Sequence, residues 1–288
     1  MNMKKVLKLL GMVIATSIIL VGCGQSNNKK QNGDQDMDNK DNVQDIDMDD
    51  VKVTPGADNK IEEEVLKDYE ARLAFETNLD EYDSAMFEIA DGWSNGHMFD
   101  CTWRKDNLTF SDGIMRLTID SDGENAKPKW SGSEYRSREF YSYGLYEVRM
   151  KPIKNNGVVS SFFTYTGPSD NNPWDEIDIE FLGKDTSKMQ LNYFTNGIGN
   201  HEYMHDLGFD AADDFHTYAF EWLPDSITWY VDGEAIYTAT DNIPSTPSKV
   251  MMNVWPGIGV DSWLKAYDGT VPLTAEYDWI RVTQYDIQ

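Results

Sequence analysis

The segment Pro173–Phe181 (PWDEIDIEF) alternates acidic residues with large apolar ones at a period of two. In a β-strand, side chains two residues apart point to the same face of the sheet. The alternation therefore predicts a strand with one face packed in a core and one acidic face. The apolar face holds Ile177, Ile179 and Phe181. The acidic face holds Trp174, Glu176, Asp178 and Glu180.

Three carboxylates in succession on one strand face are costly, because like charges repel and each raises the pKa of its neighbours. A solvated outer face would mix Lys, Thr and Ser among its acids, and this segment does not. We therefore favour a carboxylate-pair active site over a merely acidic outer face.

Cleavage of a glycosidic bond is the chemistry that most needs such a pair, since one carboxyl must be protonated and the other ionised. A third acid helps to keep the two proton affinities apart. Retaining enzymes place the pair ~5–5.5 Å apart, but positions i and i+4 of a straight strand are separated by ~13 Å at Cα. We thus expect a curved strand on which Glu176 and Glu180 lean together, with Trp174 and Trp255 as platforms for sugar rings.

Short alternating runs separated by turn signals occur throughout the rest of the chain. Asp232-Gly233 between two of them is a strong tight-turn signal. Many strands without a long amphipathic helix after residue 76 predict an all-β fold of two stacked antiparallel sheets, a sandwich or jelly roll. The expected strands span 108–110, 115–119, 143–150, 158–165, 189–195, 218–222, 227–231, 235–238, 250–255 and 276–285.

The amino terminus has the features of a targeting signal. Three lysines precede an apolar run over residues 9–21 that is too short to be a convincing membrane-spanning helix. The run ends in Leu-Val-Gly-Cys, which resembles a bacterial lipobox, in which cleavage precedes the cysteine and the cysteine carries lipid. Simple secretion is the alternative, but that signal would end in small residues. We predict a signal peptide over residues 1–22 and lipidation of Cys23, which would anchor the protein to the extracellular face of the cell membrane without spanning it.

Residues 23–73 are predicted to form the lipidated terminus and an acidic flexible linker. Asn, Gln, Asp and Lys dominate up to about residue 60, and such a composition cannot bury enough apolar surface to fold. Residues 61–75 show partial helical periodicity, which indicates a helix at the edge of the folded part. Residues 74–288 then form one large β-domain.

Charge and cysteine content limit the partners and the sources of stability. The formal net charge of −25 argues against nucleic acid, whose phosphates need cationic partners. It suits an outward-facing monomer that acts on an uncharged polymer. The chain has two cysteines, so lipidation of Cys23 leaves Cys101 without an intrachain disulfide partner.

Two other segments resemble metal-binding motifs but lack features that those motifs need. His201–His205 (HEYMH) matches the zinc-protease pattern, which needs both histidines on one helix. Loop-forming residues on both sides leave no room for such a helix. Residues 120–124 (DSDGE) lack the spacing and the terminal Glu of a calcium loop and are interpreted as a turn.

From Trp93 onward the chain resembles the bacterial lichenases of glycoside hydrolase family 16, which are endo-β-1,3-1,4-glucanases with a β-jelly-roll fold. The undivided E-x-D-x-E spacing is similar to that of lichenases and plant xyloglucan transferases, whereas laminarinases of the family usually carry one extra residue as a bulge. The matching stretches are SNG at 94–96, MF at 98–99, CTWR at 101–104, YGLYEVRMK at 143–151, VSSFFTYTGP at 159–168, PWDEIDIEFLGK at 173–184 and MMNVW at 251–255.

The resemblance implies a role for each matched position. Glu176 would be the nucleophile, Glu180 the general acid/base and Asp178 the assisting acid. No catalytic cofactor is implied, but a structural Ca²⁺ on the convex side is, held by backbone carbonyls of Asn78 and Gly113 and by Asp278. The positions that would line the β-glucan cleft are Trp93, Asn95, Glu134, Arg136, Phe163, Tyr165, Trp174, Gln190, Asn192, Phe194, Glu202, Asn253 and Trp255.

The chain departs from the lichenase pattern at two places. Gly132 stands where many lichenases pair a second cysteine with the equivalent of Cys101, and Phe194 replaces a cleft tyrosine. We expect a surface-anchored retaining endo-glucanase that cleaves β-1,4 bonds next to β-1,3 bonds. The alternatives are another specificity on the same fold, such as β-1,3-glucan or xyloglucan, and a lipoprotein that binds glucan without cutting it. The acid triplet argues against pure binding, because neutral sugars need aromatic and amide groups but no crowded acids.

Overall fold

The computed structural model describes residues 70–287, and the predicted signal peptide, Cys23 and most of the predicted linker lie outside this range. The described chain is almost entirely β-structure. Its only helices are the 3₁₀ turns η1 (Lys105–Asn107) and η2 (Pro168–Asp170) and the short α2 (Asp261–Leu264). No helix among these residues is both long and apolar enough to cross a membrane.

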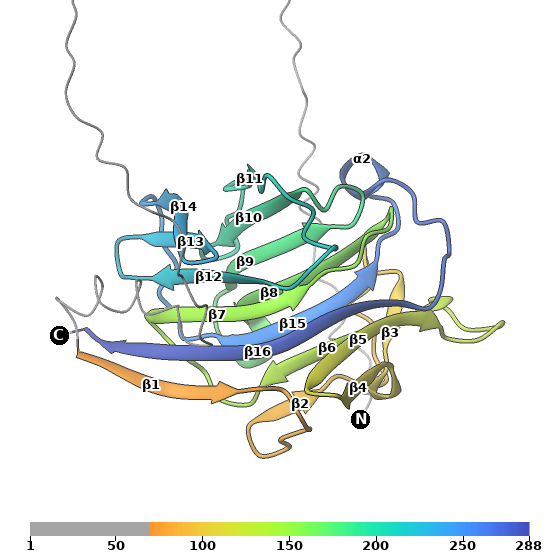
Figure 1. Ribbon diagram of the computed structural model, residues 1–288, viewed down its shortest axis with the longest axis horizontal. Helices are drawn as coiled ribbons and strands as arrows, with labels where there is room; N and C mark the ends of the chain where they lie inside the picture. Colours follow the sequence, from red (N-terminus) through yellow and green to blue (C-terminus); the bar gives the residue numbers. More distant parts are fainter. Residues whose placement is uncertain (1–69, 288) are drawn as a thin grey trace, which may run out of the picture. The chain divides into compact units, whose positions relative to one another are not determined.

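Two antiparallel sheets form the two layers of the fold (Figure 1). The first sheet has the order β11-β10-β9-β8-β15-β6. Its strands are β6 (Trp130–Ser137), β8 (Val158–Thr166), β9 (Asp175–Leu182), β10 (Lys188–Phe194), β11 (Tyr203–Asp206) and β15 (Lys249–Pro256).

The second sheet has the order β14-β13-β12-β7-β16-β5. Its strands are β5 (Ile114–Ser121), β7 (Gly144–Lys151), β12 (His216–Trp222), β13 (Ile227–Val231), β14 (Glu234–Ala239) and β16 (Leu273–Asp286). Strands β5 and β6 pair over two residues, so one hydrogen-bonded path joins the two sheets.

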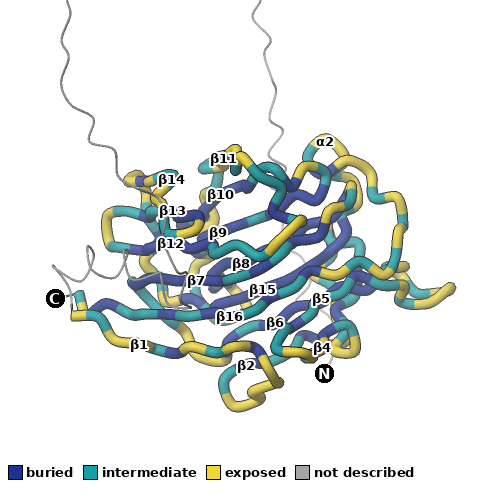
Figure 2. The backbone as a smooth tube through the Cα atoms, in the orientation of Figure 1, coloured by how far each residue is buried: buried dark blue, intermediate teal, exposed yellow. Residues whose placement is uncertain are grey.

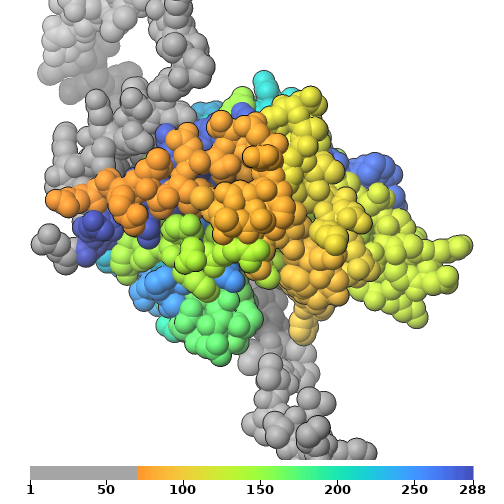
Figure 3. All heavy atoms as spheres, turned by 90° about the horizontal axis from the view of Figure 1, so that it is seen from below, coloured from red at the N-terminus to blue at the C-terminus, as the bar shows by residue number. Residues whose placement is uncertain are grey.

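Four further strands extend the two sheets. β1 (Glu70–Thr77) pairs with β16, β4 (Leu108–Ser111) with β5, and β2 (Phe87–Ile89) and β3 (Cys101–Trp103) with β6. The β3–β6 pair is parallel, and every other strand pair is antiparallel. The first described strands, drawn in orange, form much of the face seen in Figure 3.

The core lies between the sheets, where alternate residues of facing strands meet. Phe162 of β8 contacts Phe220 of β12 at a ring distance of 5.9 Å, and Phe181 of β9 contacts Tyr218 of β12 at 4.8 Å. Trp229 of β13 also donates its indole N–H across the core to the carbonyl of Asp178 at 3.1 Å. The central strands are accordingly the most buried part of the backbone in Figure 2, and this packing holds β9 rigidly against the second sheet.

The all-β fold and the alternation along β9 are confirmed. Ile177, Ile179 and Phe181 are in the core, and each predicted strand after residue 107 overlaps an observed one. The predicted helix is wrong where the structure describes it, because residues 70–77 form β1. Backbone pairing of β1 along β16, from Glu70↔Asp286 to Thr77↔Ile280, overrides the weak local helical pattern. The sheet therefore begins four residues before the predicted boundary at 74.

Candidate active site

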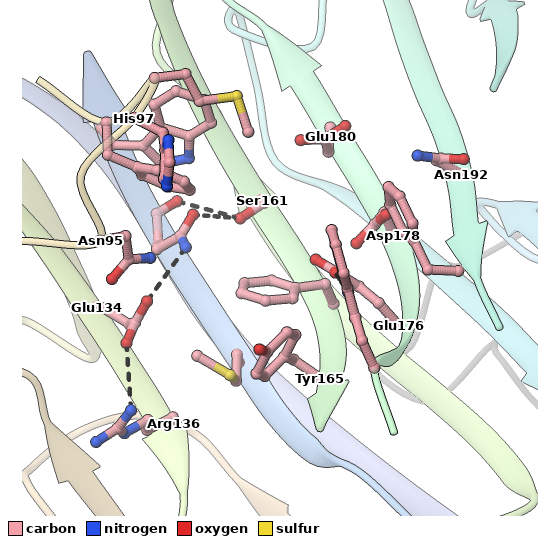
Figure 4. A pocket seen from close by; sticks show the side chains of 18 of the residues that line it. Asn95, His97, Glu134, Arg136, Ser161, Tyr165, Glu176, Asp178, Glu180 and Asn192 are labelled. Carbon is pink, nitrogen blue, oxygen red and sulfur yellow. Dashed lines mark hydrogen bonds and ion pairs between the residues drawn. The ribbon is translucent and has the colours of Figure 1, made fainter. Parts of the chain in front are cut away.

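One groove runs along the face of the first sheet that points away from the core, with a volume of about 1140 Å³. All the residues predicted to be catalytic or to line a cleft lie in its wall. In Figure 4, Glu176, Asp178 and Glu180 follow one another along β9, and Asn95, Glu134 and Arg136 lie across the groove from them.

Strand register places each of the three groove acids between one residue of β8 and one residue of β10. Glu176 lies between Tyr165 of β8 and Phe194 of β10. Asp178 lies between Phe163 and Asn192, and Glu180 between Ser161 and Gln190. Because side chains alternate along each strand, all nine point into the groove. The acids are thus surrounded by aromatic rings at one end and by amide and hydroxyl groups at the other.

Glu176 is held by its neighbour two residues before it. The Trp174 indole N–H donates to Oε2 of Glu176 at 2.5 Å, and the Trp174 ring stacks on Phe194 at a centroid distance of 4.6 Å. Burial raises the pKa of Glu176 to about 7, and hydrogen bonds from Trp174 and Asp178 oppose that rise.

Asp178 is only 4% exposed, so its charged form is poorly solvated. Burial raises its pKa well above the usual value for Asp, and the charges of Glu176 and Glu180 raise it further. The hydrogen bond between Asp178 and Glu176 raises the pKa of Asp178 and lowers that of Glu176, so it favours a proton on Asp178 and the ionised form of Glu176.

Glu180 accepts a hydrogen bond from the Gln190 amide nitrogen at 2.7 Å. Burial raises the pKa of Glu180 to about 8, the charges of Glu176 and Glu202 add to the rise, and the Gln190 bond lowers it. Near neutral pH the strand can therefore present one ionised carboxylate, at Glu176, and one protonated acid, at Glu180.

Across the groove a polar network surrounds Glu134. Ser161 Oγ donates to the Asn253 side-chain oxygen at 2.6 Å, and Asn253 Nδ2 donates to Glu134 at 3.4 Å. Burial raises the pKa of Glu134 to about 7, against the opposing charge of Arg136. Arg136 lies over the Trp93 ring, with Cζ at 5.1 Å from its centroid. These groups offer hydrogen-bond donors and acceptors beside an exposed ring, the combination that binds sugars.

The remaining wall is aromatic. Trp255 packs on Phe99 at a ring distance of 4.2 Å and lies 6.0 Å from Trp263. Asn95 accepts a hydrogen bond from the Trp103 indole at 2.9 Å, which orients its amide toward the groove.

Several groove residues were not predicted. Ser161 and Met251 could have been found by extending the period of two from Phe163 and Asn253. Trp263 could not, since it comes from the helical turn α2, which has no sequence signal. The unpredicted lining residues are Gly96, His97, Met98, Phe99, Ser161, Ser169, Asp170, Lys249, Met251 and Trp263.

The HEYMH segment does not form a metal site. Residues 203–206 are the strand β11, so the two histidines cannot lie one helical turn apart. No cluster of three or more His, Cys, Asp or Glu side chains suited to a metal occurs within residues 70–287. The DSDGE segment comprises the last two residues of β5 and the start of the loop that follows, and Asp122 there pairs with Arg104 at 2.6 Å.

The segments that contain the predicted calcium ligands end near one another on the second sheet. Asp278 forms a bulge in β16, between the part that pairs with β5 and the part that pairs with β1. Asn78 directly follows β1 and Gly113 directly precedes β5, so both segments end beside the bulge. Two carbonyls and a carboxylate are oxygen donors of the kind that Ca²⁺ prefers, although Asp278 also pairs with Arg149.

These observations define a two-layered β-jelly-roll protein with a carboxylate-bearing groove. Residues 95–281 match the sequence profile of glycosyl hydrolases family 16, and the chain belongs to this family. It is 61% identical over 204 residues to a beta-glucanase of Bacillus subtilis, which covers 70% of this chain and 83% of that protein. It is also 61% identical over 200 residues to a beta-glucanase of Acetivibrio thermocellus, covering 69% of this chain but only 59% of that longer protein.

Solved structures give the same relationship. A lichenase from a mouse hindgut metagenome superimposes with a TM-score of 0.71 at 59% identity, over 72% of this chain and 97% of that one. The Bacillus licheniformis beta-glucanase superimposes with a TM-score of 0.70 at 56% identity, over 74% and 98%. Laminarinases such as that of Thermotoga maritima share the fold at 20% identity.

Proposed function

We propose that this protein is a retaining endo-glycosidase that hydrolyses β-1,4 linkages adjacent to β-1,3 linkages in mixed-linkage β-glucans. The observation that carries the proposal is the row Glu176, Asp178, Glu180 on one groove strand, where burial raises the pKa of both glutamates into the neutral range. The beta-glucanase and lichenase names of relatives about 60% identical support the substrate class.

In the first step, protonated Glu180 donates its proton to the glycosidic oxygen while the carboxylate of Glu176 attacks the anomeric carbon. The bond from that carbon to the leaving oxygen breaks, and an ester bond to Glu176 forms on the opposite face of the sugar. The hydrogen bond between Asp178 and Glu176 limits repulsion within the row.

In the second step, the ionised Glu180 takes a proton from water, and that water attacks the anomeric carbon from the face that the leaving group vacated. The ester bond breaks, Glu176 becomes a carboxylate again, and Glu180 regains its proton. Two inversions give a product of retained β-configuration.

The test is product analysis of the full chain on lichenan, barley β-glucan, laminarin and cellulose, with the anomer of the first product assigned by NMR. Cleavage of lichenan but not cellulose, with a β-anomer first, is the expected result. Faster release from laminarin would overturn the mixed-linkage assignment, and an α-anomer would overturn the retaining mechanism.

We also propose that the chain is a lipoprotein, with residues 1–22 removed as a signal peptide and Cys23 lipidated, and that it works as a monomer at the extracellular face of the cell membrane. The lipobox-like sequence supports this. Cys23→Ser should abolish incorporation of labelled palmitate and move the protein to the aqueous phase of a detergent extraction. Aqueous partitioning of the wild-type protein would contradict it.

A structural Ca²⁺ held by Asn78, Gly113 and Asp278 is proposed as well, because the register brings these segments together around the bulge of β16. A bound ion would stabilise the junction of β1, β5 and β16 by mass action. Chelation should lower Tm by a few degrees, and Asp278→Asn should remove this sensitivity. An unchanged Tm in chelator would exclude the site.

A further inference from the structure

Trp263 reaches Glu180 through one intermediate side chain. The Trp263 indole N–H donates to Oε1 of Gln190 at 2.9 Å, and Nε2 of the same amide donates to Oε2 of Glu180 at 2.7 Å. The three residues come from α2, β10 and β9, so the connection exists only in the folded protein.

Trp263 is held firmly in this position. Leu264 next to it is completely buried, and its carbonyl accepts a hydrogen bond from the Gly157 N–H at 2.8 Å. The Lys184 ammonium donates to the Trp263 carbonyl. Gly257 has no side chain to obstruct α2, since a Cβ there would lie 2.7 Å from the Leu264 side chain.

The chemistry of these donors gives the connection a direction. An indole N–H can only donate a hydrogen bond, whereas a primary amide has a donor end and an acceptor end that exchange when it rotates. Because Trp263 occupies the oxygen of Gln190, the NH₂ group must face Glu180. A Gln190 amide rotated the other way would present its oxygen to Glu180 and would accept the proton of the acid.

We propose that Trp263 is a positioning residue, which locks the Gln190 amide so that its oxygen cannot accept the proton of Glu180 and the proton stays available to the leaving-group oxygen. This inference rests on the proposed role of Glu180 as general acid/base. The titratable groups that face Glu180 are Glu176 and Asp178 on its own strand and Glu202 before β11, while Ser161 and Gln190 flank it from β8 and β10. All three titratable neighbours are acids, so Gln190 provides the opposing donor.

Trp263→Phe in the full chain tests this lock by keeping a ring and removing the donor. With the amide free to rotate, protonated Glu180 gains an acceptor, so its pKa should rise. The alkaline limb of kcat/KM should then move up by about 0.5–1 pH unit. The rate should fall only where the leaving group needs protonation: about 3–10-fold for a phenyl β-glycoside of a mixed-linkage oligosaccharide and little for the dinitrophenyl one.

A double-mutant comparison isolates the path through Gln190. In a Gln190→Met background, Trp263→Phe should add no further loss, because the amide that it orients is gone. Trp279→Phe, a tryptophan of the second sheet, is the matched control and should leave the dependence on the leaving group unchanged. Site-specific replacement of Trp263 by benzothienylalanine removes the N–H from a ring of the same shape, and should reproduce the effect even if Trp263→Phe does not fold.

Equal losses for both leaving groups, an unmoved alkaline limb or additive losses with Gln190→Met would overturn the proposal. The Glu180 carboxyl can also be titrated by ¹³C NMR without any substrate. If the wild-type chain cleaves no glucan, the proposed function fails. The inference fails separately if the pKa of Glu180 is the same in the wild-type protein and in the Trp263→Phe variant.

Discussion

Glu147 on the second sheet and the groove acids of the first sheet are buried with opposite kinds of partner. On the second sheet Glu147 is 1% exposed and receives two hydrogen bonds from Arg281, at 2.6 and 2.8 Å. On the first sheet Asp178 is 4% exposed, and no ion pair within residues 70–287 involves it or Glu176 or Glu180. Outside the row, Glu176 accepts a hydrogen bond from the neutral donor Trp174 and Glu180 from the neutral donor Gln190.

This difference separates structural acids from chemically useful ones. A guanidinium keeps a buried carboxylate ionised, because it compensates the lost hydration. A neutral donor offsets only part of that loss, so the pKa values rise to about 7 and about 8. Acids that titrate near neutrality can exchange protons during a reaction, and the groove strand contains two of them, Glu176 and Glu180.

The largest expected effect is the loss of either groove glutamate. Glu176→Ala and Glu180→Ala should each lower kcat/KM on lichenan by about 10²–10⁴-fold or more, because one deletes the nucleophile and the other the proton donor. Azide should rescue both mutants with activated substrates, giving the α-glycosyl azide with Glu176→Ala and the β-anomer with Glu180→Ala. NMR of the products decides this, and the reverse pairing would exchange the two roles.

The next largest effect is expected when Glu147 on the second sheet loses the guanidinium of Arg281. Arg281→Met leaves Glu147 buried without its guanidinium and should lower the free energy of unfolding by about 3–5 kcal/mol in urea titrations. The kcat of the protein that remains folded should be unchanged. Glu147→Met combined with Arg281→Met should recover part of the loss. A loss of unfolding free energy below about 1 kcal/mol is typical of an exposed ion pair. That result would contradict the contrast between the Glu147–Arg281 pair and the groove acids.

A smaller effect is expected when Glu176 loses its neutral donor. Trp174→Phe keeps the stack on Phe194 but removes the 2.5 Å hydrogen bond. That bond lowers the pKa of Glu176, so its loss raises the pKa. Because Glu176 must be ionised to attack, the acid limb of kcat/KM should move up by about 1 pH unit. A limb that stays in place or moves down would show that Trp174 does not stabilise the carboxylate.

The smallest effect is expected from Phe194→Tyr, which adds a hydroxyl at the groove floor opposite Glu176. One extra hydrogen bond to a sugar should lower KM on lichenan by about 2–5-fold and leave kcat unchanged. Phe194→Leu, which removes the stack on Trp174, is the contrasting variant and should raise KM. A change of kcat with Phe194→Tyr would mean that the hydroxyl acts on the acids.

Much of the fold and the candidate site follows from local pattern. Strand alternation is a property of the backbone, so a period of two in residues 173–181 was enough to place Ile177 in the core and Glu176 in the groove. The same period identified most strands to within a few residues, since each run could be interpreted without knowledge of its partner. The identity of the groove residues came from a resemblance spread over many short stretches.

Pairing over long sequence separations was decided by tertiary structure. Residues 70–77 form a strand because β16, about two hundred residues later, offers them a free edge. The contact of Trp263 with Gln190 joins residues 73 positions apart and depends on the seating of a four-residue helix. The pKa values near 7 and 8 also depend on burial, which alternation alone does not measure. The sequence by itself determined which side chains share a strand face, since that depends on the backbone repeat. Only the tertiary structure decided which neighbours, solvent or charges those side chains meet.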